Sequence, residues 1–210
     1  MSLFFVILCW VVFFVCLFRA VAPKSFSARE YAWQWVAWLV SRERVRNWLI
    51  NRAMRTPYSH LPGYMNRYWL FNAYEKRNGQ EVTPIRWLPS IRVHHILRRD
   101  DDRHLHDHPW NARTILLKGW YTEQRMIGGP KFAHARITHA RLRGQTAKLK
   151  FGEYHTITSV SEGGVWTLFI TYGYKGMWGF LVDGKKVPWR EYLGMKPDGP
   201  WAEEERTNEA

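Results

Sequence analysis

From about Trp69 onwards, short runs of β-branched and aromatic residues alternate with Gly, Pro and Asp. Such runs are typical of strands separated by turns. They predict strands at Ile85–Trp87, Ile91–Leu97, Thr114–Gln124, Phe132–His139, Thr146–Phe151, His155–Val160, Val165–Tyr172 and Trp178–Val182. No helical pattern separates them, and many short strands at even spacing favour an antiparallel sandwich or a small barrel. The expected fold class is therefore mainly β.

The N-terminus is apolar and carries no charge from Met1 to Phe18. As a helix this run spans roughly 25–27 Å, short but sufficient for a membrane. The segment lacks the basic start of a cleaved signal peptide, and its one candidate cleavage site, Ala20-Val21-Ala22, is followed by Pro23. We therefore expect residues 1–22 to be an uncleaved transmembrane anchor, with a cleaved signal peptide as the alternative.

The chain is strongly basic, with 31 Lys and Arg against 18 Asp and Glu and a formal net charge of +13. Such an excess favours an anionic partner, either lipid or nucleic acid. Basic residues outnumber acidic ones eight to two between Arg19 and His60, so the positive-inside rule predicts a single-pass protein with a cytoplasmic soluble part. Both cysteines, Cys9 and Cys16, lie in the apolar run, which excludes disulfides and cysteine-bound zinc elsewhere.

Residues 23–58 are expected to form one basic, Trp-rich amphipathic helix and a linker. The pattern Ser27-x-x-Glu30 is a capping box, which marks a helix start. Two interpretations of this helix have equal weight. In the first, the helix lies at a lipid headgroup surface, where Trp and Arg are both stable. In the second, it packs on the domain through Trp35, Trp38, Val45 and Leu49. "RTPYSHLPGYMNRY" has two prolines and a glycine and is interpreted as linker. The acidic tail, 196–210, is expected to be flexible.

Histidines are the candidate chemical groups. His106 and His108 stand two residues apart, so on an extended strand both rings face one side, about 6–7 Å apart. His155, at the start of a later strand, could supply a third ligand. Three protein ligands leave positions open on a divalent metal, as a catalytic site requires. The alternative is a hydrogen-bonded pair in a turn, and His104 is expected to be a solvated neighbour of Asp100–Asp102.

The pattern H-x-H, then Gly in "LLKGWYTE", then G-x-x-H in "GEYH" resembles the two motifs of the cupin superfamily. That resemblance implies a double-stranded β-helix barrel, here over residues 59–195. The Glu that cupins usually add after the second histidine has no counterpart in "PWNAR", which implies a three-histidine site. The stretch from Ile91 to Tyr192, with its "LHDHPW" motif, is also similar to uncharacterised cupin-like proteins of bacteria and phages.

"LHDHPWNARTILLKGWYTE" looks more weakly like the thiol dioxygenases, which hold ferrous iron with three histidines. In cysteine dioxygenase a Tyr follows the third histidine by one strand, and Tyr172 stands at the matching place. The resemblance implies a catalytic role for Tyr172 in positioning substrate. Leu168 and Ile170 replace the Ser and His that precede this Tyr in the dioxygenase, so the match is partial.

The sequence thus predicts a membrane-anchored cupin that binds a divalent metal through His106, His108 and His155. Fe(II) is the favoured ion, with Zn, Mn or Ni as alternatives, and the expected reaction is dioxygenation of a small molecule. One rival is a non-catalytic cupin-fold module for a small ligand or protein partner, and another is a metal-independent sugar epimerase. Expected partners are membrane lipid and a small-molecule substrate. A homodimer is left open, and nucleic acid is not expected.

Overall fold

The structure is a computed structural model that describes residues 27–77, 80–128 and 135–194. The chain divides into two compact units with the boundary after Trp35. The predicted anchor at 1–22 and the predicted tail at 196–210 lie outside the described residues. None of the helices within the described ranges has both the length and the hydropathy needed to cross a membrane.

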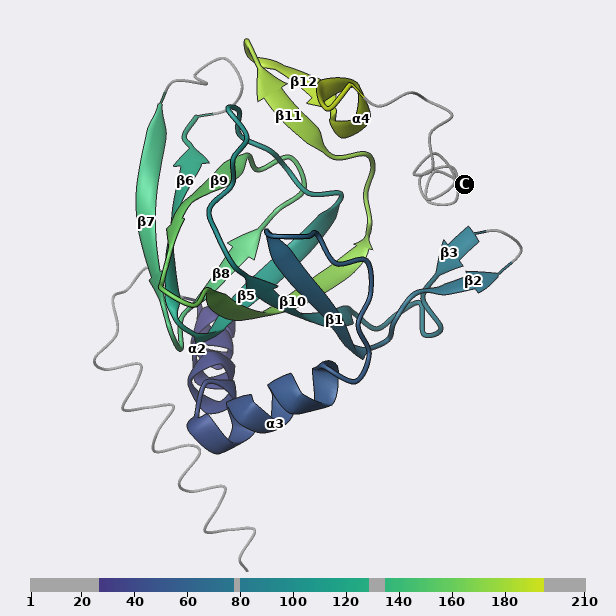
Figure 1. Cartoon of the computed structure of the whole chain (residues 1–210), viewed down its shortest axis with the longest axis vertical. Helices are drawn as coiled ribbons and strands as arrows, with labels where there is room; N and C mark the ends of the chain where they lie inside the picture. The colour runs from purple at the N-terminus through teal and green to yellow at the C-terminus, as the bar shows by residue number, and fades with distance from the viewer. Residues whose placement is uncertain (1–26, 78–79, 129–134, 195–210) are drawn as a thin grey trace, which may run out of the picture. The chain divides into compact units, whose positions relative to one another are not determined.

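The second unit is built mainly from antiparallel β-sheets (Figure 1). The larger sheet has five strands in the order β1-β4-β10-β5-β8, and a second has three in the order β7-β6-β9. Their bounds are β1 Met65–Phe71, β4 Ser90–Ile96, β5 Trp110–Lys118, β6 Trp120–Met126, β7 Arg136–Leu142, β8 Thr146–Leu149, β9 His155–Val160 and β10 Val165–Tyr174. Two hairpins complete the described strands, β2 Glu75–Arg77 with β3 Gln80–Val82 and β11 Gly179–Val182 with β12 Lys185–Pro188, before the short helix α4, Trp189–Tyr192.

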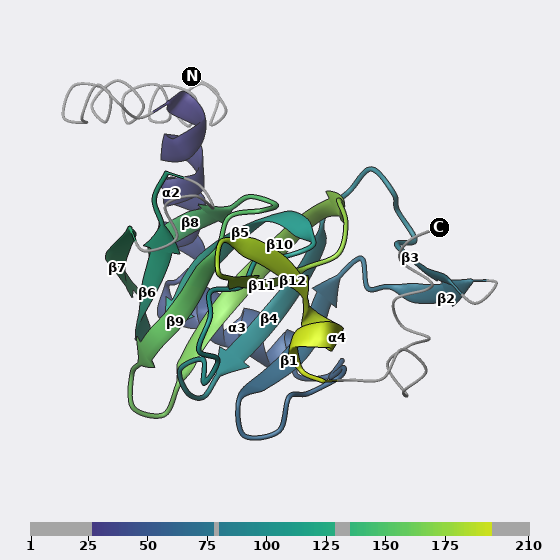
Figure 2. The same cartoon turned by 90° about the horizontal axis from the view of Figure 1, so that it is seen from above.

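The run expected to be one strand, Thr114–Gln124, is two strands that belong to different sheets. Gly119 separates β5 from β6 with φ +79°, in the left-handed region that favours glycine. A Cβ at this position would collide with the Ser161 hydroxyl and lie 2.9 Å from the Gly164 carbonyl oxygen. The turn at Gly119 therefore carries the chain from the five-stranded sheet into the three-stranded one (Figure 2).

The two sheets share one hydrophobic core. Its buried members are Ile96, Leu116, Tyr121, Ile157 and Val165. Three of these side chains come from the five-stranded sheet and two from the three-stranded sheet. Two antiparallel sheets closed around a common interior agree with the expected mainly β, cupin-like fold.

Two predictions for the region before β4 are wrong. The expected strand at Ile85–Trp87 is a turn, held by the Asn72 side chain, which accepts from the Ile85 backbone N–H at 3.0 Å and donates to the Leu88 carbonyl at 3.1 Å. The supposed linker contains the first four residues of β1, Met65–Tyr68, and this strand pairs with β4 along the edge of the larger sheet. The prolines and the glycine lie in the segment just before β1, which covers the other edge of this strand: the Tyr58 and Leu61 amides donate to the Arg67 and Met65 carbonyls at 3.0 and 2.8 Å.

The expected single helix is two helices, α2 at Ala28–Val40 and α3 at Glu43–Ala53. Between them the Ser41 hydroxyl donates to the Trp38 carbonyl at 2.9 Å, and Arg42 adopts an extended backbone. Helix α3 contacts β1 and β4 and buries Leu49, as the packing interpretation expects, whereas Trp35 and Trp38, which it also expects to pack, are 38% and 46% exposed. Trp48 is 64% exposed, so the opposite face of α3 stays free of the domain.

Candidate metal centre

The predicted H-x-H strand is a short extended segment rather than a member of either sheet. His106 forms an isolated bridge with His155: the His106 amide donates to the His155 carbonyl at 3.0 Å, and the His155 amide donates back at 2.9 Å. A second bridge joins His106 to Phe180 in β11. The segment is thus fixed on one side by the start of β9 and on the other by the C-terminal hairpin.

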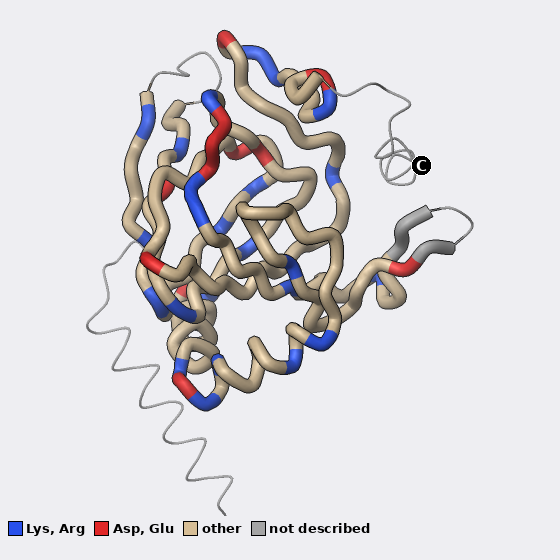
Figure 3. The backbone as a smooth tube through the Cα atoms, in the orientation of Figure 1, with Lys and Arg blue, Asp and Glu red and all other residues tan. Residues whose placement is uncertain are grey.

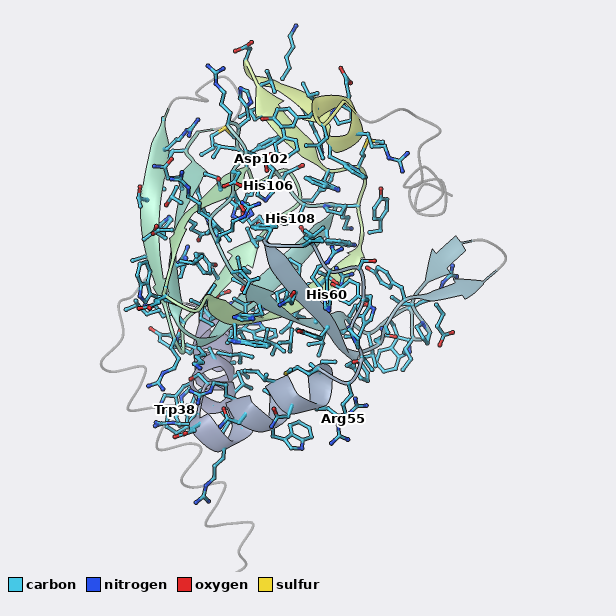
Figure 4. All side chains as sticks on the ribbon, viewed as in Figure 1. Trp38, Arg55, His60, Asp102, His106 and His108 are labelled. Carbon is cyan, nitrogen blue, oxygen red and sulfur yellow. The ribbon has the colours of Figure 1, made fainter. Side chains whose placement is uncertain are left out.

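Asp107 fixes which way the two histidines point. Its side chain is fully buried and accepts from the Gly179 backbone N–H and from the Lys186 ammonium, both at 2.7 Å. Because side chains alternate along extended backbone, His106 and His108 face the opposite way from Asp107. Figure 4 shows both rings close together in the interior.

The structure brings His106, His108 and His155 together. One ring nitrogen from each lies within 4.8 Å of the others, and the Nε2 atoms of His108 and His155 are 2.9 Å apart. The Nδ1 atom of His106 is buried with no hydrogen-bond partner among the described residues. Three converging nitrogens, one of them without any hydrogen-bond partner among the described residues, fit a divalent cation, which would bind all three at once.

Burial keeps these rings in the form that binds metals. It lowers the pKa of His106 to about 4, with the His155 charge acting in the same direction and Asp100 opposing. Burial also lowers the pKa of His108 well below its usual value, helped by nearby positive charge. Both imidazoles are therefore neutral at pH 7, and a neutral ring nitrogen is the atom that coordinates a metal.

Glu123, to which the sequence assigned no role, orients His155. One carboxylate oxygen lies 3.3 Å from His155 Nδ1, while Arg125 and Arg141 donate to the other oxygen at 2.9 and 2.6 Å. Burial by itself raises the pKa of Glu123, but the hydrogen bond from His155 and the charges of His155 and the two arginines lower it overall. An ionised Glu123 accepts a hydrogen bond from the Nδ1–H group of His155. The other ring nitrogen, Nε2, then carries no proton and can coordinate a metal.

A cavity of about 240 Å³ adjoins the three histidines. Its walls are mostly apolar and aromatic, with Met65, Ile96, Trp110, Phe169, Trp178 and Phe180 among the lining residues. Polar groups also reach it, including Tyr58, Arg67, Arg92, His94 and Asp100. A small apolar cavity with a few convergent polar groups is typical of a small-molecule site.

The structure does not bring Tyr172 to this cavity. In β10 the lining residues are Thr167 and Phe169, and alternation along the strand places Tyr172 on the other face of the sheet, where its register partner is Asn111. The proposed catalytic role of Tyr172 therefore finds no support in its position.

The other histidines near the site do not belong to the three-histidine cluster and contact other groups. His104 Nδ1 lies 3.0 Å from the Tyr192 hydroxyl, outside the three-histidine cluster. The neighbours His94 and His95 face opposite sides of β4, because side chains alternate along a strand. His94 lines the cavity, whereas His95 stacks on Trp166 with ring centroids 4.1 Å apart.

No protein-family model matches the sequence. No curated protein matches it at a significant level either. Solved structures of similar fold include oxalate decarboxylase of Bacillus subtilis, at 12% identity and a TM-score of 0.45, with 69% of this chain and 33% of that chain covered. Hydroxypropylphosphonic acid epoxidase from S. wedmorenis matches at 12% identity and a TM-score of 0.38, covering 52% and 51%.

DMSP lyases match at 15% identity and a TM-score of 0.37, covering 53% of this chain and 48% of that chain. The chain spans about a third of the length of the oxalate decarboxylase. All three are cupin-fold proteins.

Proposed function

We propose that the protein is a cupin-type metalloprotein that binds one divalent cation through His106, His108 and His155. The observation that carries the proposal is the convergence of three ring nitrogens within 4.8 Å, at the edge of a cavity. Fe(II) is the favoured ion, because three neutral imidazoles suit iron and leave positions open for a substrate and dioxygen, and Zn, Mn or Ni are alternatives.

The proposed reaction is oxygenation of a small molecule. A bound cation would be held by the three histidines and would supply the open coordination and redox chemistry that an oxygenation needs. The chain's own groups prepare the site: Glu123 holds the proton on His155 Nδ1, and the aromatic walls around Phe169 and Trp178 exclude water. No step is assigned to Tyr172.

Metal analysis of the full-length protein, purified without oxygen, tests this proposal. We expect about one equivalent of metal in the wild type and its loss in His106→Ala and His155→Ala, since two ligands cannot hold the ion as three do. His104→Ala and His95→Ala are matched controls that should keep it. A wild-type protein without stoichiometric metal would contradict the proposal, and metal without dioxygen consumption would favour a non-catalytic binding module.

We also propose that the chain is held at a membrane, with its soluble part in the cytoplasm. Support comes from the apolar run at residues 1–18 and from the exposed face of α3, which presents Trp48 with Arg44 and Arg52. Figure 3 shows Lys and Arg positions along this helix, and Figure 4 shows Arg55 at its far end. Trp and Arg side by side suit an anionic headgroup layer.

Flotation of the full chain with lipid vesicles tests the surface contact. We expect Trp48→Ala with Arg52→Gln to weaken association with vesicles containing phosphatidylserine more than with phosphatidylcholine vesicles, because only the first carry negative charge. Arg136→Gln, which removes an exposed charge from β7, is the control. Equal loss with both lipids would remove the role proposed for the arginine.

A further inference from the structure

The turn between β3 and β4 is held in one backbone conformation by the Asn72 side chain. Its amide nitrogen donates to the Ile85 and Leu88 carbonyl oxygens at 3.0 and 3.1 Å, and its oxygen accepts from the Ile85 backbone N–H at 3.0 Å. The Ser90 hydroxyl donates back to the Asn72 backbone carbonyl at 3.0 Å. Asn72 is 9% exposed and adopts φ +51°, a left-handed conformation that Asn tolerates better than most residues. The turn therefore has a fixed shape before it meets any partner.

This turn presents the most exposed large apolar side chain of the described residues. Trp87 is 83% exposed, against 64% for Trp48, the next in order. Ile85 in the same turn is also exposed, as is Phe71, the last residue of β1 and the chain neighbour of Asn72. Large aromatic side chains dominate the energetics of interfaces, and a backbone that is already ordered lowers the entropy cost of binding. The turn thus has the properties of a binding element.

The turn also continues the exposed face of α3. The Trp69 amide donates to the Thr56 carbonyl oxygen at 2.9 Å, which ties β1 to the residues just after α3. From Trp69 the strand runs two more residues to its end, and the Asn72 side chain bonds the next residue to the turn. In Figure 1 the ends of α3 and β1 lie side by side. Four exposed apolar side chains follow this path and are called the Trp87 patch: Trp48, Met54, Phe71 and Trp87.

The charges beside the Trp87 patch are mainly positive. Arg52 and Arg55 are exposed at the end of α3, and Arg86 is exposed next to Trp87. Glu75, at the start of β2, is exposed and has the opposite charge. Trp and Arg together suit a lipid headgroup layer, where the ring lies at the interface and the guanidinium meets anionic headgroups. A second copy of the chain would bring the same arginines together, which is unfavourable, so the charges favour an anionic membrane as the partner.

We propose that the turn held by Asn72 is a second lipid contact, at which Trp87 enters the headgroup layer of an anionic membrane and Arg86 meets its negative charge. This contact rests on the membrane association proposed above, and it adds to the contact at α3. The uncharged apolar run at residues 1–18 favours a lipid partner over a protein. Because α3 and the turn belong to the same compact unit, two contacts fix how that unit is oriented on the membrane, whereas a single helix face lets it pivot.

Fluorescent labels on the full chain, reconstituted in vesicles, test this contact. Cys9→Ala and Cys16→Ala remove the native thiols, and Trp87→Cys then carries a nitrobenzoxadiazole group, whose emission rises severalfold on leaving water. In vesicles that contain phosphatidylserine, we expect this label to brighten, to be quenched by spin-labelled lipid and to be protected from aqueous iodide. Lys185→Cys is the matched control and should stay accessible to iodide, because it is an exposed position on the β11–β12 hairpin, at the other end of the barrel from α3 in Figure 1.

Arg86→Gln, combined with the label at position 87, tests the charged part of the contact. It should lower the ratio of lipid-bound to water-exposed label roughly fivefold in phosphatidylserine vesicles and hardly at all in phosphatidylcholine vesicles, since only the first attract an arginine. Arg136→Gln, which removes an exposed charge from β7, should leave the ratio unchanged. Trp87 and Arg86 are both exposed, so these substitutions should leave the fold intact. An equal loss with both lipids would overturn the role given to Arg86.

The same label at Trp48→Cys separates this proposal from the one for α3. Lipid contact at both positions supports both proposals, and contact at position 87 alone supports the turn and removes α3. Contact at position 48 alone overturns the turn and leaves α3 standing, whereas contact at neither position overturns both. A label at position 87 that is protected from iodide but not quenched by lipid would mean that protein covers the turn, and this result also overturns the lipid contact.

Discussion

Glu123 and Arg92 are both buried charged residues whose side chains reach the same interior, but their surroundings differ. Glu123, fully buried in β6, is bonded by Arg125, Arg141 and His155. Arg92, in β4, meets aromatic rings and no carboxylate of the described residues. A fully paired buried charge fixes the structure around it, because breaking one pair leaves the other charge buried and alone, whereas a buried charge without a counter-charge has no such pair to lose.

The largest expected effect is a loss of stability in acid, which is caused by the buried histidines of the cavity rather than by Glu123 or Arg92 themselves. The folded-state pKa of His106 is about 4 against an ordinary 6.5, so its contribution is complete above pH 6.5 and is lost as the pH falls toward 4. The difference corresponds to roughly 3 kcal/mol, and His108 acts in the same direction. Denaturant unfolding of the metal-free chain between pH 7 and 4 measures it.

We expect a second loss of folding stability at lower pH. The folded-state pKa of Glu123 lies below its ordinary 4.5, so its contribution is present above pH 4.5 and disappears below it. A variant with His106→Gln and His108→Gln should show a flatter profile between pH 6.5 and 4 while keeping the lower step. An unchanged profile in this variant would mean that other groups cause the loss.

The next-largest effect is expected from the substitution that removes the Glu123 carboxylate. Glu123→Gln should lower the free energy of unfolding by about 2–3 kcal/mol, because Arg125 and Arg141 lose their carboxylate at a mostly buried site. It should also weaken metal binding roughly 10–100-fold by freeing the His155 ring. Glu153→Gln is the matched control. Glu153 is 42% exposed and lies 3.7 Å from Arg125, so less than about 0.5 kcal/mol should be lost.

Removing the unpaired charge should have the smallest effect. Arg92→Met keeps the length of the side chain and should leave the free energy of unfolding within about 1 kcal/mol of wild type, since lost cation–π contacts and the relieved buried charge offset each other. Urea unfolding of the ligand-free chain measures it. A loss as large as that of Glu123→Gln would mean that Arg92 is as structural as Glu123.

Local signals predicted individual strands but not how they combine. The strand His155–Val160 is confirmed to the residue, because the turn at Gly152 marks its start. The break at Gly119 was missed, since one glycine in an apolar run marks a turn only where the backbone needs a positive φ. The helix break at Ser41 was missed for a similar reason: it depends on one hydroxyl-to-backbone hydrogen bond within a continuous helical pattern.

For the site, the H-x-H spacing and the cupin resemblance predicted the three histidines that the structure places together. Glu123 and Arg92 could not be assigned from the sequence, because their roles depend on pairing between distant strands. Glu123 is 32 residues from His155, and Arg92 meets Phe169 only through the β4–β10 register. No local pattern distinguishes a buried arginine from the many exposed ones in a chain with this composition.

The double bridge of His106 also bears on the order in which the chain is made. His106 pairs with His155 and with Phe180, and Phe180 lies in β11, after every other strand of the barrel apart from β12. A chain that stops growing at the end of β10 already carries all three histidines. It lacks the strand that holds the H-x-H segment from its second side, so on the ribosome we expect the three-histidine cluster to be among the last features to form.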